Sequence, residues 1–129
     1  DVVATGSSGS VAVWNGSAWT AHVIDSTAYL SDLVEVPADG GGTVVLVATR
    51  SFGAKGAKGY FEVDSSTWTV VDDRGLVSTL TNFQTTLEET SITKLYYDSV
   101  GTRLFALTGG DGLWSNAWNG TAWSGWNRE

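Results

Sequence analysis

The sequence predicts an all-β fold of antiparallel strands, because its composition, its turn motifs and its internal similarity all favour one. Glycine occurs 16 times and proline once, which suits many short strands joined by tight turns. Val, Thr and Trp are abundant, and β-branched and aromatic side chains favour pleated strands over helices. Asn-Gly pairs at residues 15–16 and 119–120 stand between Trp-containing segments, and Asn-Gly is the strongest short hairpin signal.

Three hairpins with similar endings organise the chain, at residues 11–20, 60–69 and 117–124. Each Asn-Gly pair predicts a type I′ turn, in which both central residues have φ > 0, and Asp64-Ser65-Ser66 is a looser version of this turn. The hairpins place Trp19, Trp68 and Trp123 about fifty residues apart, a period typical of repeat architectures. This recurrence predicts that the three indoles occupy a core or inter-unit packing position.

An apolar strand is predicted upstream of each hairpin, and another strand precedes it in the second and third cases. The chain therefore divides into one three-stranded and two four-stranded units, about 2.75 units in all. One domain of 129 residues accommodates them. Residues 51–59 are expected to form an enlarged turn, and residues 74–91 a linker with a short helical turn. The apolar strands are 2–5, 43–49 and 102–108, the strands before them are 33–36 and 94–98, and the units span 1–25, 28–73 and 90–129.

Two resemblances follow from these motifs. Residues 109–114 (Gly-Gly-Asp-Gly-Leu-Trp), followed by Asn119-Gly120 and the strand at Trp123, resemble the blade repeat of bacterial β-propellers of the two-component-regulator and kelch-like kind. The phrase Trp-Asn-Gly-(Ser/Thr)-Ala-Trp at 14–19 and 118–123 is similar to hairpins of bacteriophage tail-fibre and other virion proteins. The first resemblance implies antiparallel, propeller-like four-stranded units, and the second implies a virion protein.

The number of units also matters for the predicted fold. Closed propellers have roughly four to eight blades, so about 2.75 units leave the fold open. Other copies, or the remainder of a longer polypeptide, are expected to supply the missing pairing, because an exposed apolar strand edge otherwise promotes aggregation. A β-sandwich uses the same strands and turns and is the alternative architecture.

Charge and composition exclude several functions. The net charge of −7 opposes binding to nucleic-acid phosphates, and no apolar run reaches the length of a membrane span, so neither nucleic-acid binding nor membrane insertion is expected. The absence of cysteine excludes thiol catalysis, disulfides and Cys-ligated zinc.

The polar residues do not predict an enzyme. His22 is the single histidine, and no strained nucleophile turn accompanies it. The adjacent acids at 72–73 and 88–89 point to opposite faces of an extended chain. Asp39 and Asp111 lie in loops without the alternating oxygen ligands of a calcium loop. The sequence therefore predicts no catalytic residue, no metal and no cofactor.

Four tryptophans recur less regularly than the other three, and some of their rings are expected to be exposed. Strand alternation puts Trp114 and Trp118 on one face, and it points Trp123 and Trp126 to opposite faces unless a bulge intervenes. Exposed indoles stack on sugar rings or anchor a neighbouring subunit. The predicted contact surface consists of Trp14, Asn15, Trp114, Trp118, Asn119 and Trp126.

Together these features predict a non-catalytic structural or assembly module of a virion or another extracellular assembly. Its β-edges and tryptophans are expected to contact other copies of the chain or other assembly subunits. The alternative is a glycan-binding, lectin-like module in which the same tryptophans and asparagines form shallow sugar sites.

Overall fold

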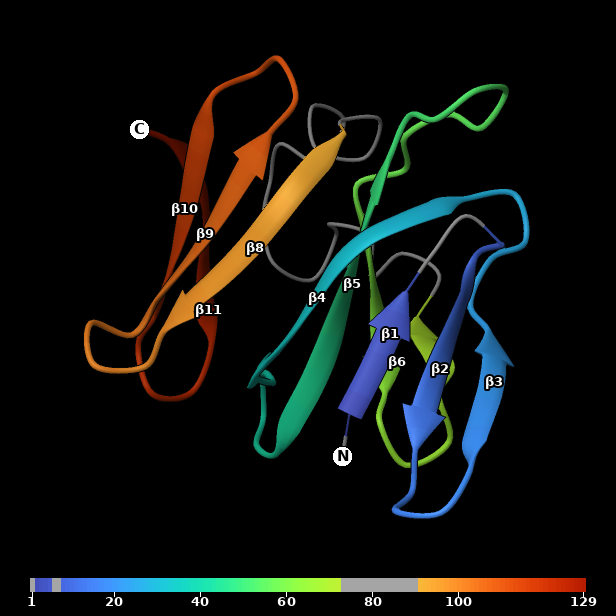
Figure 1. Cartoon of the computed structure of the whole chain (residues 1–129). Coiled ribbons are helices and arrows are strands. Elements are labelled where there is room, and N and C mark those ends of the chain that lie inside the picture. The colour runs from blue at the N-terminus through green and yellow to red at the C-terminus, as the bar shows by residue number, and fades with distance from the viewer. Residues whose placement is uncertain (1, 6–7, 73–90) are drawn as a thin grey trace.

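The computed structural model describes residues 2–5, 8–72 and 91–129, and within these ranges the protein is all-β, without a helix (Figure 1). Residues 74–90 of the expected linker, with its helical turn, lie outside the described ranges. The strands are β1 (Val2–Thr5), β2 (Ser10–Trp14), β3 (Trp19–Val23), β4 (Tyr29–Pro37), β5 (Thr43–Arg50), β6 (Tyr60–Asp64), β7 (Thr69–Asp72), β8 (Ile92–Asp98), β9 (Arg103–Thr108), β10 (Leu113–Trp118) and β11 (Trp123–Arg128).

The strands form three antiparallel sheets, none of them closed. Sheet 1 has the order β1-β2-β3, sheet 2 has the order β4-β5-β6-β7, and sheet 3 has the order β8-β9-β10-β11. Each strand therefore pairs with its neighbours in sequence, as in a series of hairpins. The described residues thus form three sheets, and not the two stacked sheets of a sandwich.

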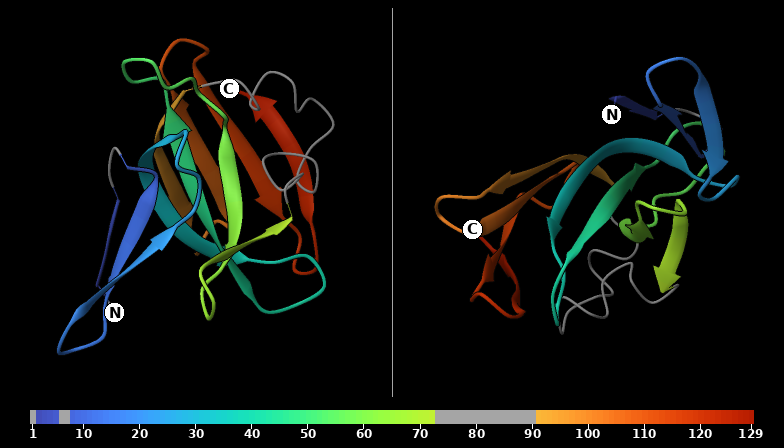
Figure 2. Two further views of the ribbon diagram at one scale, coloured as in Figure 1. Left: turned by 90° about the vertical axis from the view of Figure 1, so that its right-hand side faces the viewer. Right: turned by 90° about the horizontal axis from the view of Figure 1, so that it is seen from below.

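Sheet 2 lies between the other two sheets, with the blue sheet 1 and the orange to red sheet 3 on either side (Figure 2). Its strand β5 is buried continuously from Val44 to Thr49. Such a run occurs where both faces of a strand are covered, whereas a strand with one wet face alternates apolar and polar residues. The sequence Val-Val-Leu-Val-Ala in β5 is therefore explained by its position in the middle of the stack.

Two apolar clusters fill the spaces on the two sides of sheet 2. Alternate residues of β5 belong to different clusters, because successive side chains of a strand point to opposite faces. The cluster between sheets 2 and 3 contains Val36, Val44, Leu46, Ala48, Tyr60, Ile92, Leu95, Leu104, Ala106, Trp114, Trp123 and Trp126. The cluster between sheets 1 and 2 contains Val11, Ala28, Leu30, Val45, Val47, Phe61 and Val63.

Sheets 2 and 3 share two local details at corresponding positions. The first is a register shift in the first strand of each sheet, between Leu30 and Asp32 in β4 and between Ile92 and Lys94 in β8. The second is a buried threonine at the end of the next strand. Thr49 and Thr108 each donate both the backbone N–H and the hydroxyl to one glycine carbonyl, of Gly59 and of Gly112 respectively.

Polar contacts fix the first strands of the two sheets to each other. The Ser31 hydroxyl donates to the carbonyl of Ile92, and the N–H of Leu95 donates to Asp32 Oδ2 at 2.8 Å. The ammonium group of Lys94 lies 3.9 Å from the same Asp32 oxygen. These directional contacts set the register of sheet 3 against sheet 2, which apolar packing alone does not do.

The burial of β5 predicts the effect of a truncation there. Leu46→Ala removes a side chain with no exposed surface from the cluster between sheets 2 and 3, and we expect a loss of about 2–5 kcal/mol in the free energy of unfolding. Urea denaturation followed by circular dichroism measures this loss. Val71→Ala, at a β7 position that is 60% exposed, is the control and changes stability by less than about 1 kcal/mol. Equal effects of the two variants would contradict the double-sided burial of sheet 2.

Candidate contact surface

Two tryptophan pairs with nearly the same geometry lie at the ends of two hairpins. Trp14 and Trp19 are cross-strand partners of β2 and β3, with ring centroids 5.5 Å apart and ring planes at 51°. Trp118 and Trp123 are the corresponding partners of β10 and β11, at 5.3 Å and 53°. Aromatic cross-strand pairs of this kind stabilise a hairpin, and here the two pairs have different surroundings.

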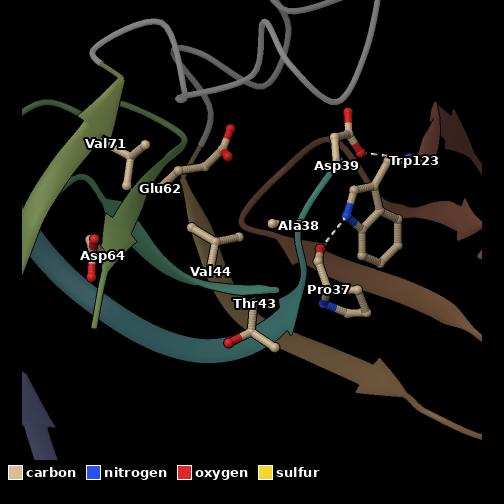
Figure 3. Close-up of a pocket in the computed structure, with 9 residues that line it drawn as sticks. All are labelled: Pro37, Ala38, Asp39, Thr43, Val44, Glu62, Asp64, Val71 and Trp123. Atoms are coloured by element: carbon tan, nitrogen blue, oxygen red, sulfur yellow. Dashed lines mark hydrogen bonds between the residues drawn. The ribbon is translucent and has the colours of Figure 1, made fainter. Parts of the chain in front are cut away.

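In the sheet 3 pair, Trp123 lies against the turn between β4 and β5 (Figure 3). The Trp123 indole Nε1 donates to the carbonyl of Pro37 at 2.8 Å, and its backbone N–H donates to Asp39 Oδ1 at 3.0 Å. The N–H of Gly40 donates to the carbonyl of Thr121 at 3.3 Å. Trp123 is consequently buried, as the sequence predicts, and Asp39 is used to position this tryptophan.

The pair in sheet 1 has no such cover among the described residues. Trp19 is 53% exposed, and Trp14 is half-buried. The prediction that Trp19 is a packed residue like Trp123 is therefore wrong, because no described residue covers it as the β4–β5 turn covers Trp123. Trp68, the third tryptophan of this series, is half-buried against the cluster between sheets 1 and 2. Its ring stacks on His22, with centroids 6.2 Å apart.

Trp14 and Trp19 belong to a larger apolar face that points away from sheet 2. In β2 and β3, Val11 and Val13 face sheet 2, so the alternate residues and their cross-strand partners face outward. Val23, at the end of this face, is 66% exposed. We call this the outer face of sheet 1, and it consists of Ser10, Ala12, Trp14, Trp19, Ala21 and Val23.

Sheet 3 also has an outer face, on which exposed apolar side chains lie beside charged ones. Leu104 and Ala106 face sheet 2, so their neighbours in β9 and the partners of these neighbours face outward. Tyr96 stacks on Phe105 with centroids 6.4 Å apart, and Leu107 is 49% exposed. We call this the outer face of sheet 3, and it consists of Lys94, Tyr96, Asp98, Arg103, Phe105, Leu107, Leu113, Ser115 and Ala117.

Two members of the predicted contact surface, Trp114 and Trp126, are buried inside the protein. Trp126 has no exposed surface, and its Nε1 donates to the Tyr60 hydroxyl at 3.2 Å. Trp114 is buried, and its Nε1 donates to the carbonyl of Asp111 at 3.0 Å. Neither ring is available to a partner. For Trp126, the reason is the register shift between Asn116 and Trp118, which turns this residue to the same side as Trp123.

Trp118 lies between these extremes, since it is half-buried and packs against the cluster between sheets 2 and 3. Strand alternation correctly put Trp114 and Trp118 on one face of β10. The outer face of sheet 3 was not among the predicted contact residues, because residues 104–107 are all apolar and their sequence does not show which side chains face outward.

Asn15 and Asn119 shape the hairpin turns, and the type I′ prediction for both is wrong. The Oδ1 atom of Asn15 accepts hydrogen bonds from the N–H and hydroxyl of Ser17 and from the N–H of Ala18, all at 2.9–3.0 Å. Asn119 makes the same three contacts with Thr121 and Ala122. Gly16 and Gly120 have φ of 104°, but neither asparagine has a positive φ. The asparagine side chain accepts the hydrogen bonds that stabilise each turn, and only the glycine adopts a positive φ.

A cavity of about 360 Å³ opens beside Trp123, between sheet 2 and the first residues of β11 (Figure 3). Its walls combine carboxylates with aliphatic side chains. Hydrogen bonds from the hydroxyl and N–H of Ser66 lower the pKa of the Asp64 carboxyl, so this wall stays anionic at neutral pH. The lining residues are Pro37, Ala38, Asp39, Thr43, Val44, Glu62, Asp64, Val71 and Trp123.

In the described ranges, no three His, Cys, Asp or Glu side chains come together in a way that would hold a metal ion. No helix in the same part of the chain is long and apolar enough to cross a membrane.

Comparison with protein families, with curated proteins and with solved structures gives no match to this chain.

The contact between Trp126 and Tyr60 predicts the effect of removing one hydroxyl. Tyr60→Phe keeps the ring but leaves the buried Trp126 N–H without its acceptor, and we expect a loss of about 1–3 kcal/mol at pH 7. Urea denaturation measures it, with Tyr96→Phe on the exposed face as the matched control and a change of at most about 0.5 kcal/mol.

The same hydroxyl predicts a pH dependence. Burial raises the pKa of Tyr60 well above its ordinary value, and the hydrogen bond from Trp126 opposes this only in part. Because the pKa of Tyr60 is higher in the folded state than in the unfolded state, its neutral hydroxyl contributes to the stability of the fold. This contribution is fully present below the unfolded pKa of about 10 and is lost as the pH rises through the folded pKa. Tyr60→Phe lacks this contribution to alkaline unfolding, so an equally steep loss in both proteins above pH 10 would contradict the burial of Tyr60.

Proposed function

We propose that the chain is a non-catalytic structural module of a virion or another extracellular assembly. Its three sheets are propeller-like units in an open stack, and its outer sheet faces bind further β units. The partners are other copies of the chain or other assembly subunits.

One observation carries this proposal, namely the contrast between the middle sheet and the two end sheets. Sheet 2 is covered on both faces, whereas the outer faces of sheets 1 and 3 leave Trp19, Val23, Tyr96 and Leu107 between 49% and 66% exposed. Clusters of exposed apolar side chains of this kind mark interaction sites in soluble proteins. An assembly would cover them in the way that sheets 1 and 3 cover sheet 2.

The propeller-like interpretation has separate support in local geometry. Sheets 2 and 3 share the register shift in the first strand and the threonine-to-glycine contact at the end of the second strand. Sheets 1 and 3 share the tryptophan pair and the asparagine turn. Related units stacked face to face, each a meander of neighbouring strands, are the organisation of propeller blades.

A glycan-binding module is the second candidate, and the exposed Trp14–Trp19 pair favours it. The pair lies directly beside the Asn15 turn. Indole faces stack on sugar rings, and asparagine hydrogen-bonds to hydroxyl groups. In this protein, however, Oδ1 of Asn15 already accepts three hydrogen bonds from its own turn, which leaves only the amide nitrogen for a ligand.

Two measurements on the wild-type chain separate these functions. An assembly module increases in mass above 13.6 kDa as its concentration rises in light scattering, and its tryptophan emission does not respond to a panel of monosaccharides and oligosaccharides. A constant monomer mass would contradict assembly through other copies of the chain. A saturable change in emission with one class of sugar would establish the glycan-binding function instead.

A further inference from the structure

We propose that the outer face of sheet 3 binds the outer face of sheet 1 of a second copy of this chain, in a head-to-tail contact. This inference rests on the proposed assembly function and specifies its partner, the two faces and their orientation.

The internal contact between sheets 2 and 3 is the template for the first face. Leu46 and Ala48 lie three and one residues before Thr49, and they pack on sheet 3. Phe105 and Leu107 lie three and one residues before Thr108, which makes the same glycine contact as Thr49. The outer face of sheet 3 therefore corresponds to the face of sheet 2 that is buried against sheet 3. The outer face of sheet 3 has no such neighbour among the described residues.

The tryptophan pairs provide the template for the second face. Trp118 and Trp123 point from sheet 3 toward sheet 2, where Trp123 lies against the β4–β5 turn. Trp14 and Trp19 have the same pairing and the same ring geometry, and they point outward from sheet 1. The outer face of sheet 1 is thus the kind of face that sheet 3 presents to sheet 2. It lacks only the sheet to which it would bind.

The two open faces match each other at the turn as well. The β8–β9 turn of sheet 3 corresponds to the β4–β5 turn that covers Trp123, because both turns join the first and second strands of a sheet. Its residue Val100 is 94% exposed. In the head-to-tail contact, this turn covers Trp19 of the second copy. One contact then accounts for an exposed valine and an exposed tryptophan at opposite ends of the stack.

Charge and strand chemistry at sheet 1 agree with this occupant. Strands β2 and β3 contain no Asp, Glu, Lys or Arg. Exposed strands of soluble proteins are normally protected by charges, prolines or bulges against pairing and aggregation. A face without such protection fits a surface that another β unit covers.

The orientation determines the form of the assembly. The two outer faces differ, and inside the chain a face of one kind packs on a face of the other kind. The contact between copies is therefore heterologous, and it forms a closed ring if the rotation from one copy to the next allows it. Two copies of three sheets give six sheets, within the roughly four to eight blades of closed propellers. A two-copy ring then contains the head-to-tail contact twice.

A mixing experiment tests the head-to-tail orientation. Trp19→Glu blocks the outer face of sheet 1, and Leu107→Glu blocks that of sheet 3. Each variant alone is expected to self-associate at least about tenfold more weakly than wild type, because a buried unpaired carboxylate opposes the contact. In an equimolar mixture, the intact outer face of sheet 3 in the Trp19→Glu variant binds the intact outer face of sheet 1 in the Leu107→Glu variant. The mixture therefore forms a one-to-one pair. Sedimentation velocity measures all three samples.

Controls exclude trivial effects of the substitutions. Phe52→Glu introduces the same charge at an exposed aromatic residue outside both faces, 52% exposed compared with 53% for Trp19, and it leaves association unchanged. Val23→Glu and Val100→Glu repeat the test if a first variant loses its β-sheet circular dichroism.

The outcomes separate the two proposals. A wild-type chain that stays monomeric overturns the head-to-tail contact and, with it, assembly through copies of this chain. A wild-type chain that associates, with variants that are unaffected or that fail to complement each other, overturns the head-to-tail contact alone. Complementation in the mixture supports it, since a symmetric contact of one face with itself gives no such pair.

Discussion

The burial of β5 on both faces is the constraint on which the rest of the structure depends. Six consecutive residues, from Val44 to Thr49, are removed from water, and a strand of this kind is stable only if a second and a third sheet lie against it. Sheets 1 and 3 provide this cover, and each of them in turn has one dry face and one outer face. The open ends of the molecule follow directly from the way in which its centre is stabilised.

Short polar side chains build the turns of this fold, which explains why they suggest no chemistry. Oδ1 of Asp25 accepts the N–H and hydroxyl of Thr27, and Asp64 does the same with Ser66, in the pattern of Asn15 and Asn119. Burial opposes ionisation of Asp25, but hydrogen bonds from Thr27 and Lys58 lower the pKa of its carboxyl overall. Such Asx turns consume the acceptor atoms on which a catalytic or metal site would depend.

Strand existence and pairing followed from the sequence, whereas burial of individual indoles did not. The short apolar runs at residues 43–49 and 102–108 were sufficient to predict β5 and β9, because runs of this length rich in apolar and β-branched residues are typical of buried strands. Trp126 was misassigned because a single inserted residue reverses the facing of every position beyond it. The turns were misassigned because Asn-Gly was treated as a backbone signal, while the side-chain oxygen of Asn15 decided the geometry.

Trp19 and Trp123 show why the function of such a surface has to be argued from neighbours. The two residues share a phrase of sequence, a cross-strand partner and a ring geometry, so their own hairpins prepare them equally for burial. Only the β4–β5 turn, with the carbonyl of Pro37 and the carboxylate of Asp39, makes one a core residue. Since that turn belongs to the neighbouring sheet, Trp19 is exposed because no described residue covers it in this way, and not because its hairpin differs. Under the proposed assembly function, this indole would be a packing site for a further β unit.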